Sequence, residues 1–388
     1  MAPIRSFMAW AAAGGAALLA AAAVALIWAN LAPAAYASFW ATEVAGHPFS
    51  AVVNDGLMAI FFLLIGLEMK RELTVGELAD RRAAALPVAA ALAGMLLPAG
   101  IFLAIAGGTP AAAGWGIPMA TDVAFALAVL AALRARVPPA LWAFLLGVAV
   151  IDDIGAIIVI AVAYPDGIRA GWLAAAMAAL IAFGVLARRR VRGAAPFILL
   201  GTTAWAFTAL SGINATIAGV AVGLLIPAAL PGQPAGTAPL ARTVRVVHPW
   251  SSFVILPVFA LANAGIVFRS GAMDADGALA ALLGASLGLL AGKAIGVPLG
   301  AWLAIRTGLG RMPTGAGWGQ MIGIGLIAGT GFTVSLFITD LAFDDASLQD
   351  AARIGVLAGS VVAAIAGALV LLASGRARTP RPGEPARG

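Results

Sequence analysis

The stretch ALWAFLLGVAVIDDIGAIIVIAVA, residues 140–163, decides the class of fold. Its 24 residues are apolar except for two adjacent carboxylates, Asp152 and Asp153, which stand thirteenth and fourteenth. A helix needs about 20 mostly apolar residues to cross a lipid bilayer. At 1.5 Å per residue, the two carboxylates lie roughly 18–20 Å along such a helix, near the bilayer midplane. The stretch therefore predicts a membrane-spanning helix with charge at its centre.

The composition of the whole chain is that of a protein embedded in lipid. Of its 388 residues 62% are hydrophobic and 10% are charged, and the mean hydropathy is +1.03. Soluble domains run nearer half apolar and a quarter charged. The pI is near 10.9, but the basic residues are scattered between apolar segments, which argues against a nucleic-acid partner. The chain has no cysteine, which excludes disulfides, thiolate metal sites and thiol nucleophiles.

Twelve segments of this kind predict an all-α polytopic membrane protein. They lie near residues 8–29, 51–69, 84–106, 112–132, 140–163, 171–187, 196–210, 213–229, 249–268, 278–304, 318–339 and 354–374. No stretch between them is long enough for a soluble domain, so we expect residues 1–388 to form a single membrane domain, with helices over about 8–374. Residues 375–388, rich in Pro and Arg, are expected to form a disordered cytoplasmic tail.

The basic residues predict how the chain crosses the membrane. With the N-terminus in the cytoplasm, nineteen Lys and Arg fall on that side, and three, Arg169, Arg269 and Arg353, fall on the other. Cytoplasmic loops carry such an excess, so we predict that both termini are cytoplasmic. Arg5, the first apolar run and Ala35-Tyr36-Ala37 also resemble a cleaved signal peptide. The run exceeds the 7–15 residues of a signal core, which favours a retained helix.

Two segments contain residues that interrupt a helix. GWGIPMATDVAFALAVL (114–130) has Pro118 before Thr121-Asp122, and GQMIGIGLIAGTGFTVSLFI (319–338) has Gly329-Thr330-Gly331 at its middle. Irregular backbone at membrane depth is tolerated only where it lines a cavity or is covered by protein. Interrupted segments at matching positions of two halves point to a binding site. We therefore predict breaks in segments 4 and 11, whereas most of the 47 glycines serve close helix packing.

Four charged residues lie within segments rather than at their ends: Asp122, Asp152, Asp153 and Lys293. Each costs roughly 2.5–3.5 kcal/mol at the centre of a spanning helix, so the four cost on the order of 10–14 kcal/mol. This cost rivals the net stability of a whole domain and indicates a function. A purely structural ion pair between one aspartate and Lys293 is the alternative, but it leaves Asp122 and the second aspartate without a role.

The spacing suggests the chemistry of this cluster. Adjacent helical residues point about 100° apart, so one of Asp152 and Asp153 can face a water-filled cavity while the other reaches Lys293. Two close carboxylates disfavour joint ionisation, so the pair can exchange a proton for a cation. The carboxylates, the Thr121 hydroxyl and freed backbone carbonyls are oxygen ligands that suit a hard cation such as Na⁺. Lys293 is one of only two lysines beside 21 arginines. A buried lysine can lose its proton, whereas an arginine cannot, which suggests that Lys293 titrates.

These residues resemble the NhaA-type bacterial sodium/proton antiporters over roughly residues 8–374. The matching stretches, in the family's order, are FSAVVNDGLMAIFFLLIGLEMKREL (49–73), MATDVAFALAVLAAL (119–133), AVIDDIGAIIVIA (149–161), SGINATIAGVAVGLLIP (211–227), HPWSSFVILPVFALANAGI (248–266), GKAIGVPLG (292–300) and GTGFTVSLFI (329–338). Several long motifs in the right order make the resemblance specific.

The resemblance implies a twelve-helix fold with inverted repeats, segments three to five and ten to twelve, in which segments 4 and 11 cross at the midplane. Asp152 and Asp153 match the aspartates that bind the cation and carry the protons. Lys293 matches the lysine that pairs with the first of them. Thr121 and Asp122 match the polar pair at the crossing, where the carboxylate compensates the dipoles of the half-helices.

The resemblance also implies electrogenic exchange of one Na⁺ or Li⁺ for two protons, serving pH and sodium homeostasis in the bacterial inner membrane. No cofactor is implied beyond the transported ions. A homodimer would form through residues 31–50. Glu68 and Glu72 match acidic residues of the family's pH-responsive funnel, although by themselves they are typical solvated helix-end charges.

Three further positions bear on pH control. Asp55 matches a family carboxylate or acts as a helix N-cap. Asn214 stands where many members have a histidine, and Val244 where some carry a glutamate linked to pH sensing. The resemblance therefore does not predict the pH set-point.

Rival functions fit the pattern less well. An intramembrane aspartyl protease needs its two aspartates on facing helices, and adjacent residues of one helix cannot adopt that geometry. A channel would show a repeated or oligomeric filter, which is absent from the sequence. A sodium-coupled symporter of a small organic solute is the closer alternative, but it needs a larger polar or aromatic pocket than the central segments offer.

Overall fold

The computed structural model describes residues 2–134, 136–189, 191, 193–228, 238–267 and 275–374. Within these ranges the chain is helical apart from its loops and one short hairpin, in which β1 (Glu43–Val44) pairs antiparallel with β2 (His47–Pro48). The expected disordered tail, residues 375–388, lies outside the described residues.

Eight helical segments in the described part of the chain are long and apolar enough to cross a membrane. They are α1 (Ala2–Leu31), α3–η1–α4 (Phe49–Ala51, Val52–Leu57, Met58–Val75), α5 (Arg81–Ala106), α7 (Pro139–Ala163), α8 (Ala170–Arg188), α11–η5–α12 (Pro239–Trp250, Ser251–Ile255, Leu256–Asn263), α13–η6–α14 (Ala278–Leu287, Gly288–Gly292, Lys293–Arg306) and α17 (Ala346–Ser374). A short helix, α2 (Pro33–Ala41), follows α1, and a single turn, η2 (Glu77–Ala79), precedes α5.

Two further spans are broken, as the sequence predicted for segments 4 and 11. The 3₁₀ helix η3 (Pro110–Met119) and α6 (Val123–Ala132) meet at a bend of 47°, and α15 (Trp318–Ala328) and α16 (Phe332–Ala342) meet at a bend of 46°. The two shorter apolar helices α9 (Ala195–Leu210) and α10 (Thr216–Leu225) complete the set. Every one of the twelve predicted segments therefore contains helix, and the polytopic all-α fold class is confirmed.

Two predicted helix starts are wrong. The ninth segment was expected from residue 249, yet α11 begins at Pro239, and the twelfth was expected from residue 354, yet α17 begins at Ala346. In both cases charged residues near the helix start were taken for loop. In α17 the charge of Arg353 is matched by Asp340 of α16 at 2.6 Å, so the helix can continue through it.

Close helix contacts bring the charged residues together. Gly292, Gly296 and Gly300 recur every four residues on η6 and α14, and a Cβ at any of them would strike the backbone of α5. Small residues at this spacing let two helices approach closely without lost packing. These three glycines pack η6 and α14 closely against α5, and this contact fixes the position of Lys293, the first residue of α14, along the bundle.

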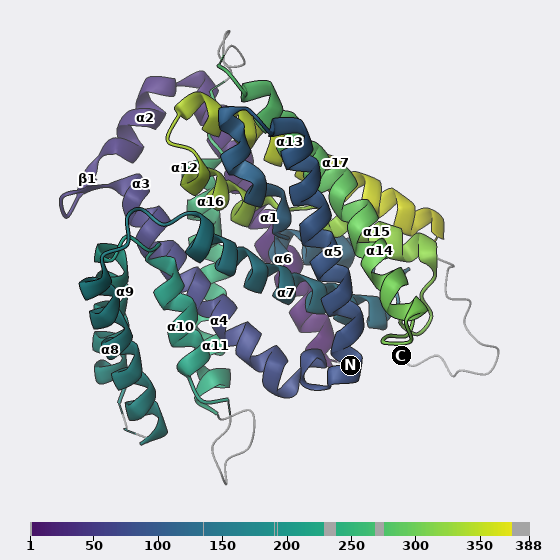
Figure 1. The fold of residues 1–388 in the computed structure, drawn as a ribbon, viewed down its shortest axis with the longest axis horizontal. Coiled ribbons are helices and arrows are strands. Elements are labelled where there is room, and N and C mark those ends of the chain that lie inside the picture. The colour runs from purple at the N-terminus through teal and green to yellow at the C-terminus, as the bar shows by residue number, and fades with distance from the viewer. Residues whose placement is uncertain are drawn as a thin grey trace.

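The broken helices lie in the interior of the bundle. Figure 1 shows α6, α7 and α16 near the centre, with α8 and α9 paired at the left edge and α2 with the hairpin at the upper left. The α1 helix packs along α6 and α12, and Leu18, Ala25 and Ala29 on it are fully buried. It is thus an integral part of the bundle.

Candidate functional site

The breaks of the two interrupted spans lie against each other. The Asp122 amide, between η3 and α6, donates to the Thr330 carbonyl, between α15 and α16, at 2.6 Å. Gly329 is required at this point because a Cβ there would clash with the carbonyl oxygen of Leu289. The stretch Gly329-Thr330-Gly331 is therefore the break, as predicted, and its backbone is covered by protein.

Asp122 caps two half-helices at once. One of its carboxylate oxygens accepts from the Phe125 amide at 2.9 Å, in the first turn of α6. The other accepts from the Thr333 amide at 3.1 Å and from the Thr333 hydroxyl at 2.6 Å, in the first turn of α16. Helix N-termini carry partial positive charge and unpaired N–H groups, so a single carboxylate neutralises both. Both of its oxygens are occupied in this way.

Asp152 forms a fully buried ion pair with Lys293. The Lys293 Nζ donates to Asp152 Oδ2 at 2.5 Å, and neither side chain has any solvent exposure. The Thr121 hydroxyl, which accepts a weaker bond from Lys293 at 3.2 Å, lies 2.7 Å from both Asp152 Oδ2 and the Ala328 carbonyl. The ammonium therefore also sits near the C-terminal end of α15, where the helix dipole is negative.

The second oxygen of Asp152 has no partner. Asp152 Oδ1 is buried and accepts no hydrogen bond from the described residues. A buried carboxylate oxygen normally finds a donor, and leaving it unpaired costs free energy. Asp152, directly before Asp153 on α7, thus keeps one carboxylate oxygen without a hydrogen bond from the described residues.

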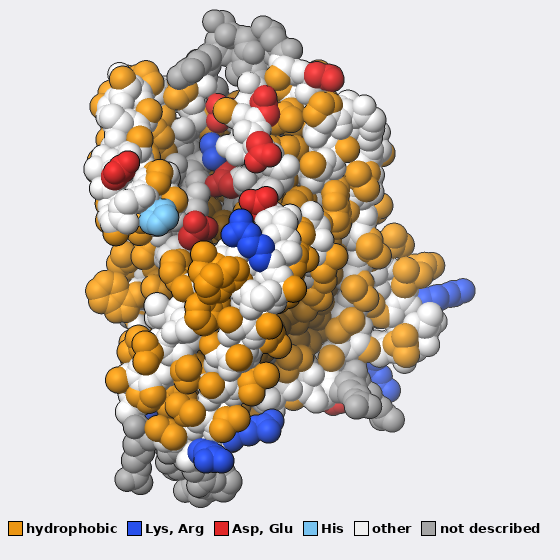
Figure 2. All heavy atoms as spheres, turned by 60° about the vertical axis from the view of Figure 1, so that its left-hand side comes forward, with side chains coloured by type: hydrophobic (Ala, Val, Ile, Leu, Met, Phe, Trp, Pro, Cys, Tyr) orange, Lys and Arg blue, Asp and Glu red, His pale blue; other side chains and the backbone are white. Residues whose placement is uncertain are grey.

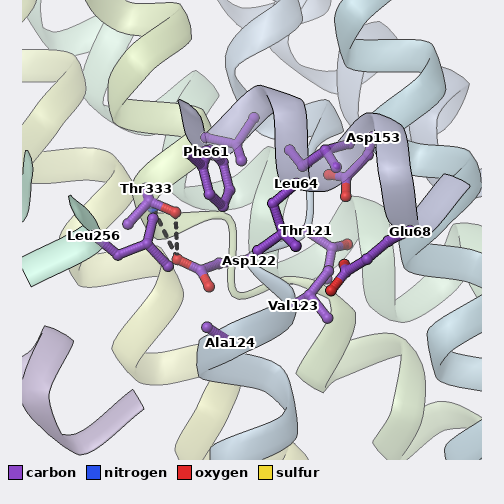
Figure 3. A pocket seen from close by; sticks show the side chains of 12 residues that line it. Phe61, Leu64, Glu68, Thr121, Asp122, Val123, Ala124, Asp153, Leu256 and Thr333 are labelled. Carbon is purple, nitrogen blue, oxygen red and sulfur yellow. Dashed lines mark hydrogen bonds between the residues drawn. The ribbon is translucent and has the colours of Figure 1, made fainter. Parts of the chain in front are cut away.

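Asp153, on the next position of α7, faces a small cavity. It is 7% exposed and lines a space of about 40 Å³ together with Glu68, Thr121 and Asp122. Figure 3 shows Asp153 from α7 and Glu68 from α4 directed into the same region, with Thr121 between them and Asp122 turned towards Thr333. This volume holds about one to three water-sized particles. The division expected from the 100° step is observed: one aspartate pairs with lysine and the other faces the cavity.

The structure separates the residues expected to respond to pH. Glu68 reaches the cavity, whereas Glu72, one helical turn further along α4, does not line it. Asp55 lies inside the helical segment that begins at Phe49, so it makes no cap bond. The prediction that Asp55 could be a helix N-cap is therefore wrong. Asn214 accepts bonds from the Thr216 amide at 3.0 Å and the Thr216 hydroxyl, so it stabilises the start of α10. Val244 lies within α11.

A second buried polar cluster was missed by the sequence analysis. Asp340 and Arg353 form an ion pair between α16 and α17, and Asn54 and Asn263 exchange amide hydrogen bonds between η1 and α12. Asp340 and Arg353 had been read as segment-end charges. The signal available in the sequence was the spacing of Asp340, which follows Thr333 by seven residues and so lies on the same face of the helix.

Comparison with known proteins gives this geometry its context. A family model described as Na+/H+ antiporter 1 matches residues 5–371. The chain belongs to this family. Its members are transporters, so this multi-pass membrane protein is not an enzyme.

Individual relatives are similar over nearly their full length. A protein of Erythrobacter litoralis named Na(+)/H(+) antiporter NhaA 2 is 44% identical over 385 residues, covering 96% of this chain and 94% of that protein. A protein of Mesorhizobium japonicum named Na(+)/H(+) antiporter NhaA is 46% identical over 377 residues, with 95% and 94% covered. The resemblance stated from the motifs is thus confirmed at family level.

Proposed function

We propose that this protein exchanges cytoplasmic Na⁺ or Li⁺ for external protons, and that cation and protons compete for Asp152 and Asp153. The observation that carries the proposal is the unpaired Oδ1 of the buried Asp152, next to a carboxylate that lines a small cavity. An exchange site needs an anionic ligand that is accessible from a cavity and not already satisfied. Among the four charged residues predicted from the sequence, Asp153 lines the cavity and its neighbour Asp152 keeps one oxygen without a hydrogen bond from the described residues.

The cavity suits a small hard cation. Carboxylate oxygens of Asp152 and Asp153, the Thr121 hydroxyl and water molecules are the oxygen ligands such ions prefer. Organic solutes occupy pockets of roughly 300–1,000 Å³, and this cavity measures about 40 Å³. That difference argues against the sodium-coupled symporter of an organic solute.

The exchange follows from charge neutralisation. A cation bound between Asp152 and Asp153 weakens the attraction of Asp152 for the Lys293 ammonium, which lies 2.5 Å from it. Protons leave the aspartate pair when the cation enters, and protons return to it when the cation leaves. The stoichiometry of one cation to two protons makes the cycle electrogenic.

Asp122 plays a supporting part in this cycle. Both of its oxygens are engaged at the two helix N-termini, so it holds the half-helices rather than the ion. Thr121, beside it, offers the hydroxyl to the site. Glu68 supplies a further negative charge on the approach to the cavity and is the better placed of the two pH-response residues.

We further propose a dimer in the bacterial inner membrane, with both termini in the cytoplasm. The excess of Arg and Lys in alternate loops supports this orientation. Residues 31–50 would form the dimer contact. The hairpin in this stretch is exposed along both strands, and it adjoins a cluster of aromatic rings in mutual contact: Trp28, Tyr36, Phe39, Trp40 and Phe49.

The test is ion-driven proton movement in inverted vesicles that contain a pH-sensitive dye. Addition of Na⁺ or Li⁺ without any organic solute should collapse a preformed proton gradient, and a membrane potential should change the rate. Collapse that requires an organic solute would identify a symporter. Rates that ignore the membrane potential would exclude electrogenic exchange.

A further inference from the structure

A second polar cluster closes one end of the bundle interior. We call the residues Asn54, Asn263, Asp340 and Arg353 the outer polar cluster. Asp340 Oδ1 accepts from Arg353 at 2.6 Å, and Asp340 Oδ2 accepts from the Asn54 amide at 3.3 Å. Asn54 and Asn263 donate to each other at 3.2 and 2.8 Å. Four helical segments, η1, α12, α16 and α17, thus meet at one hydrogen-bonded network.

This network is costly and is not fully satisfied. The Asp340 and Arg353 side chains are only 14% and 18% exposed, and the buried Arg353 Nε finds no hydrogen-bond partner among the described residues. Replacing such an ion pair by apolar residues is often neutral or stabilising. A purely structural role, in which the ion pair holds α16 against α17, would explain Asp340 and Arg353. It does not explain why Asn54, itself paired with Asn263 of α12, also bonds Asp340.

The outer polar cluster is aligned with the ion cavity. On α16, Thr333 at the cavity is followed by Phe337 and then Asp340, at spacings of four and three residues that keep one helix face. Asp340 therefore lies about 10 Å further along the axis. On the segment η5–α12, Leu256 at the cavity is followed in the same way by Phe259 and Asn263.

An aromatic layer separates the cavity from the cluster. The Phe337 ring lies 5.4 Å from that of Phe62 on α4 and 6.3 Å from that of Phe259 on α12. All three are among the largest fully buried side chains. The segments η1–α4, η5–α12 and α16 thus each contribute to the ion cavity, to the aromatic layer and to the outer polar cluster. Figure 2 shows acidic side chains gathered around a hollow in the upper half of one face, above a largely hydrophobic surface.

We propose that the outer polar cluster and the aromatic layer form the extracytoplasmic gate of the ion path, closed in this structure. Opening requires Asn54, which is held by Asn263, to part from Asp340, because the Asn54–Asp340 bond joins η1 to α16 across the path. The Asp340–Arg353 pair stays within α16 and α17 and moves with them. Parting also uncovers one oxygen of Asp340 towards the outside, where it attracts the cation that leaves or the proton that enters. This inference rests on the proposed function only for the orientation in the membrane, which names the outer side.

The test uses the absence of cysteine from the chain. Val334→Cys places one thiol in the wall of the ion cavity. A membrane-impermeant thiosulfonate reagent is applied to right-side-out and to inverted vesicles, and the labelling rate is measured with and without Asn54→Ala or Asp340→Asn. Asn54→Ala removes the bond to Asp340 together with both bonds to Asn263. Asp340→Asn weakens the bond from Asn54 and also the pair with Arg353. Loss of one such bond is worth roughly a 2- to 10-fold shift in equilibrium. We expect labelling from the outside to accelerate by that factor, with no change from the inside.

The control is Asp344→Asn, which removes the same charge from an exposed position between α16 and α17. It should leave both rates unchanged. Unaltered outside labelling in both gate variants would overturn the proposal, and so would equal acceleration from both sides, which indicates a loosened fold. Because labelling does not require transport, loss of sodium-driven exchange in the unmodified protein would count against the proposed function and not against the gate.

Discussion

The buried pair of Asp152 and Lys293 allows a quantitative test of the site. Both side chains are fully buried and 2.5 Å apart, so removal of one partner leaves an uncompensated charge. Such a loss costs about 3–5 kcal/mol, whereas removal of both partners together is close to neutral. We therefore expect Asp152→Asn and Lys293→Met each to destabilise the protein strongly. The double variant should be more stable than either single one, with a coupling energy of about 3 kcal/mol, at the upper end of measured pairs.

The assay is thermal and detergent-induced unfolding of the purified protein, followed by the fluorescence of its ten tryptophans. All three variants should lose sodium-driven exchange, so stability rather than activity separates them. A second cycle that combines Lys293→Met with Asp344→Asn, at an exposed position, should be additive. A double variant at the ion pair that is destabilised by the sum of the two single losses would refute the pairing.

Three further predictions concern the site, the topology and the pH profile. Asp153→Asn should abolish exchange while the protein stays folded, measured by dye dequenching; wild-type rates would remove Asp153 from the mechanism. A reporter fused after Arg376 should be cytoplasmic and one inserted near Gly271 external, and a common side would mean that the predicted helix count is off by one. The apparent Na⁺ affinity should improve from about pH 6 to about pH 9 as protons leave the carboxylates, and Asn214→His should shift this profile only modestly. An affinity independent of pH would exclude competition.

The two tyrosines can be excluded as the source of this pH dependence. Burial raises the pKa of Tyr36 and of Tyr164 to about 12, and these are the only tyrosines in the chain. Neither phenol changes charge between about pH 6 and about pH 9, because an ordinary tyrosine already titrates near 10. Asn214, for its part, accepts a hydrogen bond from the Thr216 amide at the start of α10. Its replacement by histidine should cost about 0.5–1.5 kcal/mol of stability through the lost hydrogen bond, independently of any effect on the pH profile.

Local features of the sequence were sufficient for most of the fold. Apolar runs locate spans because each residue contributes to burial in lipid largely independently of its neighbours. Gly329-Thr330-Gly331 and Pro118 located the breaks because they disfavour a continuous helix by their own chemistry. The starts of α11 and α17 were misjudged because charged residues near them were taken for loop. Arg242 and Arg245 lie on α11 with exposed side chains, and Arg353 lies on α17 paired with Asp340.

By itself, therefore, the sequence determined that this is a polytopic helical membrane protein with two broken spans and four costly central charges, and its motifs indicated the family. Only the tertiary structure decided what each charge does. Asp152 meets Lys293 across 141 residues of chain, and Asp122 meets Thr333 across 211. It also decided that one oxygen of Asp152 is left unpaired and that a second cluster lies beyond an aromatic layer. Such contacts depend on how closely helices pack, as at the glycine stripe of α14, and packing is a property of pairs of helices that no single segment encodes.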